Sequence, residues 1–290
     1  MKIIIIVLLR SIDFGDKMTK SNDEILQHIK DTELLILKDF ISICEENNID
    51  YYLFFGTEIG AVRHQGFIPW DDDIDVIMFR DDYERFLKIM EEHPWDKYSV
   101  FDCRYDEQYF FQFGRLSLNG TYWAEYWDSQ VSFKLGVHVD LFILDKVPNN
   151  KIKRFLYMRR CLLLCKMQAI SAIKVEEGSG LVKTIANAMH SIFNAIGLTP
   201  KHYQKKLLKL FRKYENSDSQ YYADLTMNEQ PYFKIEDFKP AKKVKFEDIY
   251  ANIPNNQEAT LGQIFGDYMQ LPPEEDRVCH VLNEIDFGEF

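Results

Sequence analysis

The stretch YYLFFGTEIGAVRHQGFIPWDDDIDVIM, from Tyr51 to Met78, decides the fold of this chain. An apolar run over residues 51–55 predicts a buried strand, and Gly56 with Thr57 breaks it. A short segment over 58–64 and a loop marked by Gly and Pro lead to a second apolar strand over 74–78. Four carboxylates stand where that second strand begins: Asp71, Asp72, Asp73 and Asp75.

The spacing of two of these acids predicts a metal site. Side chains two positions apart in a strand leave it on the same face, so Asp73 and Asp75 project together while Ile74 enters the core. Two carboxylates held that close repel each other by energies on the kcal/mol scale unless a cation lies between them. A plain acidic turn is the alternative. An EF-hand loop would need Gly where the chain has Val76.

A third acid lies inside another apolar run, over residues 136–144. Asp140 stands there between Val139 and Leu141, and such a carboxylate is costly unless it is paired or binds a metal. The end of a strand at the surface would also explain it. Beside Asp73 and Asp75 it is a natural third ligand on a neighbouring strand. Three oxygen ligands with open positions suit Mg²⁺, with Mn²⁺ as a substitute, because such ions also take phosphate oxygens.

The rest of the chain predicts an α/β fold, with a mixed sheet and a helical insertion. Helical periodicity covers residues 22–47, 81–92, 151–174, 181–196 and a segment after Pro200. Further strands are predicted over 98–103, 109–118, 136–144 and 244–249. The composition shifts near residue 150, so we expect a core over 18–150, a basic helical segment over 151–214 and a C-terminal part over 215–290 that completes the domain.

Residues 1–17 are expected to be an extension ahead of Met18. Their apolar run, from Ile3 to Leu9, is shorter than the roughly 20 residues that span a bilayer. An interfacial anchor is the alternative. The five scattered cysteines fit a reducing compartment better than a disulfide framework. We therefore expect a cytoplasmic protein.

Charge is distributed unevenly along the chain. Residues 151–213 carry 14 Lys and Arg against two acids, whereas the whole chain has a net charge of −11. Such asymmetry is typical of an interaction face, and an anionic membrane surface or nucleic acid is a candidate partner. A solvated helical face explains the same residues. Nucleic acid is not expected, because no recognised binding motif accompanies the basic residues.

The residues around the acids suit phosphate chemistry. Gly56 allows a phosphate to approach the backbone, and the hydroxyl and N–H groups of Thr57 can hold its oxygens. Arg63 and Arg115 could clamp a diphosphate as forked donors, or form structural ion pairs instead. The third carboxylate would help to deprotonate an attacking hydroxyl.

Three motifs resemble the LicD family of the nucleotidyltransferase-fold superfamily. They are GTEIGAVRHQGFIPWDDDIDVIMFRDDYERF from Gly56, VDLFILDKVP from Val139, and VKFEDIYANIP with LGQIFGDYMQLPP between Val244 and Pro273. The resemblance covers most of residues 23–280, is weakest over 151–240, and excludes the residues before Met18.

The resemblance implies a transferase that moves a phospho-alcohol from a CDP-activated donor to a sugar hydroxyl. In bacterial relatives the group is typically phosphocholine, placed on teichoic acid, lipooligosaccharide or capsule, whereas fukutin-type relatives use CDP-ribitol. It also implies a nucleotidyltransferase-like core, Asp73, Asp75 and Asp140 as metal ligands, and Gly56 and Thr57 as contacts of the donor phosphates. Asp145, in the same motif, is an alternative third acid.

The identity of the alcohol stays open. A quaternary ammonium binds to aromatic faces, and Trp70, Trp123, Tyr126 and Trp127 could form such a cage or simply pack in the core. Glycerol, ribitol or ethanolamine phosphate are equally compatible with the sequence. Transfer of a nucleoside monophosphate and a non-enzymatic scaffold are the other classes considered. The acceptor is expected to be a glycan precursor, often lipid-linked, which would give the basic segment an inner-membrane surface to contact.

Overall fold

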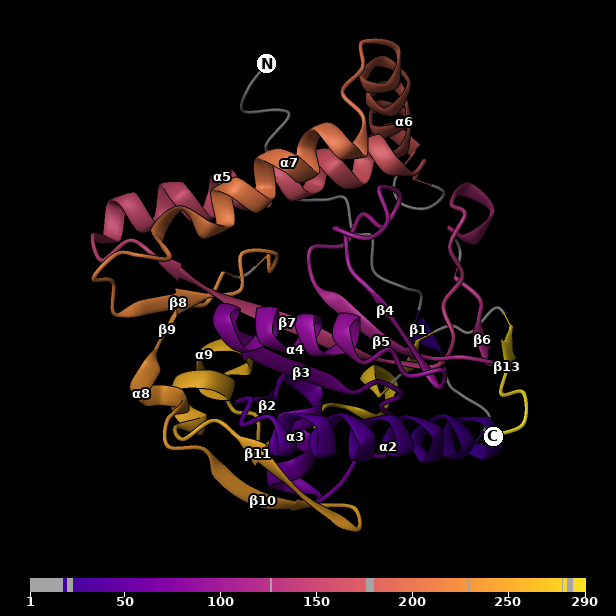
Figure 1. The fold of residues 1–290 in the computed structure, drawn as a ribbon, viewed down its shortest axis with the longest axis vertical. Coiled ribbons are helices and arrows are strands. Elements are labelled where there is room, and N and C mark those ends of the chain that lie inside the picture. The colour runs from indigo at the N-terminus through magenta and orange to yellow at the C-terminus, as the bar shows by residue number, and fades with distance from the viewer. Residues whose placement is uncertain are drawn as a thin grey trace.

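The computed structural model describes residues 18–19, 23–125, 127–175, 180–228, 230–277, 279–280 and 284–290. Its centre is a seven-stranded mixed sheet in which β2, β3, β7, β5 and β4 are neighbours in that order, and β8 and β9 continue from the end of β7. Helices lie on either side of this sheet (Figure 1). The α/β class and the mixed sheet are therefore confirmed. The extension over residues 1–17 lies outside the described residues.

Two parallel strands form the middle of the sheet. Strand β3 (Asp75–Phe79) pairs in parallel with β7 (His138–Val147), and all other pairs in the sheet are antiparallel. The remaining strands of the sheet are short: β2 (Tyr52–Leu53), β4 (Tyr98–Phe101), β5 (Gly114–Leu118), β8 (Tyr221–Ala223) and β9 (Phe233–Lys234). Because β7 is the longest, it pairs with β5 near its start and with β8 at its end.

The main core lies between one face of this sheet and two helices. Helix α2 (Asp23–Glu46) contributes Leu37 and Phe40, and α4 (Arg80–Glu92) contributes Phe86. They pack against strand residues such as Val76 and Leu141. Both helices agree with the predicted segments to within one residue. On the other face, a second cluster gathers around Phe54, Ile77 and Phe238; the last of these belongs to the short helix α8 (Ile235–Phe238).

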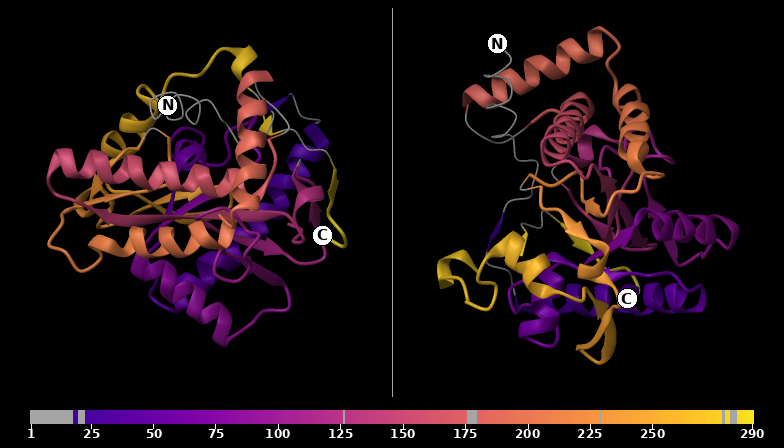
Figure 2. Two further views of the ribbon diagram at one scale, coloured as in Figure 1. Left: turned by 90° about the horizontal axis from the view of Figure 1, so that it is seen from above. Right: turned by 90° about the vertical axis from the view of Figure 1, so that its left-hand side faces the viewer.

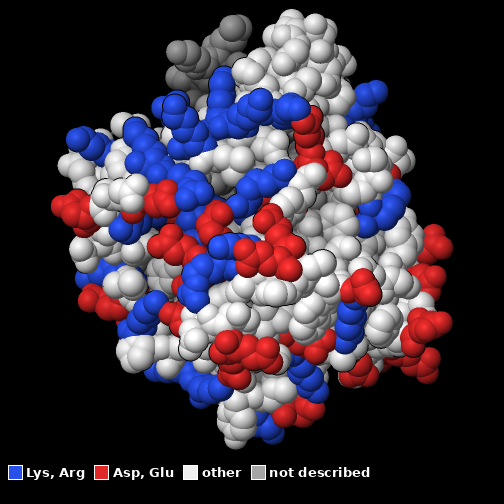
Figure 3. Space-filling model, in the orientation of Figure 1, with Lys and Arg blue, Asp and Glu red and all other residues white. Residues whose placement is uncertain are grey.

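The basic segment forms a separate helical layer. Helices α5 (Lys151–Ala172), α6 (Gly180–Ala195) and α7 (Pro200–Phe211) lie above the sheet, with α5 beside α7 (Figures 1 and 2). Their predicted positions are confirmed, and Lys and Arg side chains gather over α5 and α7 (Figure 3). Among the described residues, no helix has both the length and the apolar character to cross a membrane.

Several predicted boundaries are wrong. The first strand ends at Leu53, because α3 (Phe55–Arg63) begins where a turn at Gly56 and Thr57 was expected. The strand predicted over 109–118 is reduced to β5. The run at 244–249 is half of a hairpin, β10 (Lys242–Phe246) with β11 (Ile249–Ile253), which reverses at Glu247 in a left-handed conformation with φ 51°.

Two small sheets hold the ends of the described chain. Strand β1 (Met18–Thr19) pairs with β12 (Cys279–His280), and β6 (Tyr122–Trp123) pairs with β13 (Ile285–Asp286). The C-terminal part also contains a π-helical turn at Glu258–Gly262 followed by α9 (Gln263–Phe265). Its Leu261 packs against Ile59 of α3, so the end of the chain supports the helix that follows the first strand.

Candidate active site

Three charged residues lie in one row across the sheet. Asp75 on β3 is the register partner of Asp140 on β7, and Asp140 is the register partner of Arg115 on β5. Partnered side chains leave the sheet on the same face. The Nε of Arg115 donates a hydrogen bond of 2.8 Å to Oδ1 of Asp140. The prediction that Asp140 stands on a strand next to the D-x-D motif is therefore confirmed.

A small cavity lies at the beginning of these strands. Its volume is about 60 Å³, and it is lined by Glu33, Asp73, Ile74, Arg115, Trp123, Glu125, His138 and Asp140. The structure thus gathers four of the predicted site residues, Asp73, Arg115, Trp123 and Asp140, around one space. Because one water needs on the order of 10–15 Å³ of such space, the cavity could hold a few waters or a hydrated ion but not a whole phospho-alcohol.

Glu33 is the residue of this cavity that the sequence analysis missed. It comes from α2 and is only 2% exposed, and its Oε2 has no hydrogen-bond partner among the described residues. Burial, followed by the charges of Asp73, Asp72, Asp71 and Asp140, raises the pKa of this carboxyl well above its ordinary value. A buried acid turned toward other acids favours either a proton or a cation.

The donor set fits a hard divalent cation such as Mg²⁺. Carboxylates from α2, β7 and the segment entering β3 face the cavity, and the unsatisfied oxygen of Glu33 is a group that an ion could satisfy. Within the described ranges, no three acidic, His or Cys side chains already stand close enough together to hold an ion. The fit therefore rests on oxygen chemistry, with waters and phosphate oxygens completing the coordination.

Arg115 is packed as a structural cation as well as a wall of the cavity. Its guanidinium is 4.5 Å from the centre of the Phe111 ring, and its nearest further acid is Glu125 at 3.9 Å. Burial alone would lower its pKa, but Asp140, Tyr109 and Glu125 together outweigh burial and raise that pKa above its ordinary value. Arg115 therefore forms the structural ion pair that the sequence analysis gave as the alternative to a diphosphate clamp. One donor, Nη1, has no hydrogen-bond partner in the described part of the chain.

Gly56 and Thr57 support the acidic strand instead of opening a turn to a ligand. The Thr57 hydroxyl accepts a hydrogen bond of 2.8 Å from the backbone N–H of Asp75, and Thr57 is 3% exposed. A Cβ on Gly56 would lie 2.6 Å from Oδ2 of Asp71, so glycine makes room for that carboxylate at the first turn of α3. The expectation that Gly56 and Thr57 contact donor phosphates stays a prediction, and the Thr57 hydroxyl already accepts a hydrogen bond from the backbone of β3.

Arg63 and Trp70 lie in a second group on the C-terminal side of α3. Nη1 of Arg63 donates to the backbone oxygens of Tyr268 and Gln270, at 2.8 and 3.3 Å. Burial and the nearby charge of Arg277 lower the pKa of Arg63. The Arg277 guanidinium lies 5.0 Å from the ring centre of Trp70. Two cations therefore lie near each other beside the acidic run, and Trp70 already carries a cation on its ring.

The sequence left open whether Trp70, Trp123, Tyr126 and Trp127 form a cage or pack in the core, and the structure places Trp127 in the core and Trp123 at the acidic cavity. Trp127 is 1% exposed and packs against Phe110 and Phe133, so it belongs to the core. Trp123 does line the acidic cavity, where its ring meets His138 edge to face with centroids 5.5 Å apart. Tyr126 lies outside the described residues.

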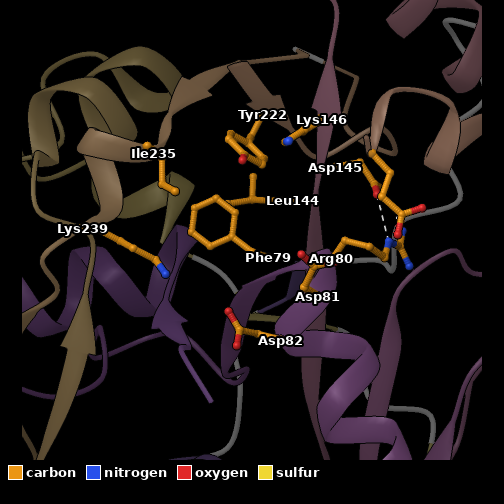
Figure 4. A pocket seen from close by; sticks show the side chains of 11 residues that line it. Phe79, Arg80, Asp81, Asp82, Leu144, Asp145, Lys146, Tyr222, Ile235 and Lys239 are labelled. Carbon is orange, nitrogen blue, oxygen red and sulfur yellow. Dashed lines mark hydrogen bonds and ion pairs between the residues drawn. The ribbon is translucent and has the colours of Figure 1, made fainter. Parts of the chain in front are cut away.

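The alternative third acid, Asp145, is committed to another interaction. It lies near the end of β7 and accepts hydrogen bonds of 2.8 and 2.6 Å from Nε and Nη2 of Arg80 (Figure 4). This pair borders a different cavity of about 180 Å³, whose apolar side includes Phe79, Leu144 and Tyr222. Asp145 is therefore neutralised at the opposite end of the strands, and Asp140 is the acid beside the D-x-D motif.

Comparisons with known proteins relate the chain to one family. Residues 48–161 match the family model described as "LicD/FKTN/FKRP, nucleotidyltransferase domain". The chain is 31% identical over 263 residues to the lipopolysaccharide cholinephosphotransferase LicD of Haemophilus influenzae, covering 87% of this chain and 94% of that protein. An uncharacterised protein of Rickettsia typhi is 42% identical over 57 residues, or 20% of this chain and 18% of that protein.

Proposed function

The chain belongs to the LicD family, and on that premise we propose that it transfers phosphocholine from CDP-choline to a hydroxyl of a cell-surface glycan. The likeness to the Haemophilus cholinephosphotransferase supports phosphocholine as the transferred group and a lipopolysaccharide-type molecule as the acceptor. The observation that carries the proposal is the acidic cavity, which places Asp73, Asp140 and Glu33 around one space. Transfer of glycerol, ribitol or ethanolamine phosphate would use the same residues.

Asp73, Asp75 and Asp140 would hold Mg²⁺, with Glu33 as an additional oxygen donor. Bound there, the ion would supply positive charge that offsets the charge of the donor's phosphate oxygens. Thr57 fixes the backbone of Asp75, and the short ion pair from Arg115 orients Asp140. The protein therefore sets the direction of its acidic ligands through contacts already formed in the folded chain.

The proposed reaction is a displacement at the phosphorus atom that carries choline. An acceptor oxygen forms the new O–P bond, the bond to the CMP oxygen breaks, and CMP leaves with its electron pair. The acceptor's proton goes to Asp140, whose Oδ1 is held 2.8 Å from Arg115 and 3.5 Å from Nε2 of His138. The donor's diphosphate would lie toward Arg63 and Arg277, whose neighbouring positive charges favour an anion between them.

Thermal-shift titration of the whole chain with CDP-choline, CDP-glycerol, CDP-ribitol and CDP-ethanolamine, each with and without Mg²⁺, tests the donor. A bound ligand at a hundredfold excess over Kd stabilises the protein by about 2.7 kcal/mol. We expect a Mg²⁺-dependent shift with CDP-choline that Asp73→Asn abolishes. Asp96→Asn, at an exposed position outside the cavity, serves as the matched control.

The product of turnover distinguishes the reaction classes. Release of CMP together with a phosphocholine-modified acceptor is expected. Release of pyrophosphate from a nucleoside triphosphate would instead favour transfer of a nucleoside monophosphate. A chain that binds neither donor type and releases neither product would contradict the proposal and leave a non-enzymatic role.

A further inference from the structure

The two helices that carry most of the basic charge form a groove between them. Tyr157 of α5 donates a hydrogen bond of 2.6 Å to the backbone oxygen of Leu210 on α7, which fixes the helices side by side. The groove beside this contact has a volume of about 620 Å³. Its lining is of only two kinds, apolar and cationic: Leu163, Leu164, Leu210, Arg160, Lys206, Lys209 and Lys213.

The cations of this groove form no ion pairs within the described part of the chain, although Lys213 lies 5.2 Å from the ring centre of Tyr214. Arg160, Lys206, Lys209 and Lys213 are exposed, and none forms an ion pair with a described acidic residue. Arg154 on the same helix shows the contrast, because it is buried, donates to backbone oxygens of Pro148 and Asn149, and stacks on tyrosine rings. Four cations that lack an ion-pair partner among the described residues, placed around leucines, indicate a ligand that is both anionic and apolar.

Apolar side chains continue from the groove along the exposed side of α5. Ile152, Phe155 and Leu156 are 71%, 56% and 61% exposed, and their spacing of three and four places them on one face of the helix. One helical turn further, the same side of α5 leads to Arg160 and Leu163 at the groove. Apolar and cationic groups on one helix face are typical of helices that lie in a membrane interface.

We propose that this face of α5 and α7 is a docking surface for an anionic phospholipid membrane. The leucine-lined groove would receive part of a lipid, the four cations would meet phosphate headgroups, and the apolar residues of α5 would enter the boundary between headgroups and chains. Nucleic acid offers the same phosphates but nothing that would cover Ile152 or Leu156, so the membrane is the better match. The inference does not depend on the transfer reaction.

Vesicle co-sedimentation of the full chain tests this surface. Vesicles of phosphatidylglycerol and phosphatidylcholine, 30:70, are compared with pure phosphatidylcholine at low and high salt. We expect binding to the anionic vesicles only. Each cation lost from the surface should weaken binding about fivefold, so reversing Lys206 and Lys209 to Glu should weaken it by about 25-fold or more.

A control with the same change of charge separates docking from net charge. Lys242→Glu with Lys245→Glu alters two exposed lysines of the β10 hairpin, on the far side of the sheet from α7 (Figure 1). This pair should bind vesicles nearly as well as the unmodified chain. A third variant, Phe155→Ser with Leu156→Ser, should lose the binding that persists in high salt.

Three results would overturn the inference. One is equal loss of binding in the β10 control and the α7 variant, which would indicate a response to overall charge. Another is full vesicle binding by both the α7 variant (Lys206→Glu with Lys209→Glu) and the α5 variant (Phe155→Ser with Leu156→Ser). That result would assign membrane binding to a different segment. The third is displacement of the chain from anionic vesicles by an equal phosphate concentration of duplex DNA. Asp73→Asn should bind vesicles like the unmodified chain, so failure here and failure of the transfer reaction are distinguishable.

Discussion

Replacing Glu58 with Gln should remove the fall in the free energy of unfolding that Glu58 contributes as the pH rises from 5 to 7. Glu58 lies in α3, directly after Thr57, and is fully buried. It accepts a hydrogen bond of 2.9 Å from the hydroxyl of Thr260, which ties α3 to the C-terminal part. Burial raises its pKa from 4.5 to about 8, and hydrogen bonds from Thr260 and Gln257 offset this only partly.

Stability falls with rising pH because the folded chain prefers the protonated form of Glu58. Below about pH 4.5 both folded and unfolded chains carry the proton, and the contribution of Glu58 is fully present. Between pH 4.5 and about 8 the unfolded chain releases the proton while the folded chain keeps it, so stability falls. The fall is about 1.4 kcal/mol for each pH unit, or about 2.5 kcal/mol from pH 5 to pH 7.

Urea denaturation at pH 5, 6 and 7 measures this difference. Other titrating groups, Glu33 included, are common to both chains, so the change in slope between the unmodified protein and Glu58→Gln reports Glu58 alone. Glu258→Gln, an exposed acid in the neighbouring π-helical turn, is the matched control and should keep the original slope. The reasoning is refuted if the unmodified protein and Glu58→Gln lose the same free energy of unfolding over this range.

Three further outcomes follow from packing, and urea denaturation measures each. Trp127→Ala should lower the free energy of unfolding by about 3–5 kcal/mol, yet leave the affinity of the folded protein for CDP-choline unchanged, because the ring is in the core. Arg80→Met should cost about 3–5 kcal/mol by leaving Asp145 buried without its partner, and adding Asp145→Leu should restore most of the loss. Gly60→Ala should destabilise by about 1–3 kcal/mol although Ala favours helices, because its Cβ would clash with the backbone oxygen of Gly66.

Two different patterns pointed to the acids of the sheet. Period-two alternation predicted that Asp73 and Asp75 share a face, and this stays a prediction because β3 begins only at Asp75. The cost of a carboxylate inside an apolar run predicted Asp140 on a neighbouring strand, and the register of β3 with β7 confirms its position. The helices at 23–46, 80–92 and 151–172 were equally predictable, because their apolar positions recur every three or four residues. These features depend on local sequence alone.

The residues that the sequence did not identify reach the site through long-range packing. Glu33 lies four positions after Ile29 and four before Leu37, on the buried stripe of α2. An acid on the buried stripe of a helix indicates a functional residue, but only the packing of α2 against the sheet gives Glu33 its acidic neighbours. Trp127 shows the reverse: its neighbourhood suggested a cage, whereas Phe110 and Phe133 enclose it.

The parallel pairing of β3 with β7 has a consequence for how the protein acquires activity. Asp75 and Asp140 are register partners, yet they are 65 positions apart in the sequence. Closing so long a loop costs conformational entropy before the new contact can offset that cost, so contacts of this kind form slowly. A chain that has formed its helices but not this pair has no acidic cavity. If Mg²⁺ binds in this cavity as proposed, recovery of its binding during refolding should therefore lag behind recovery of helical circular dichroism and would report when the sheet closes.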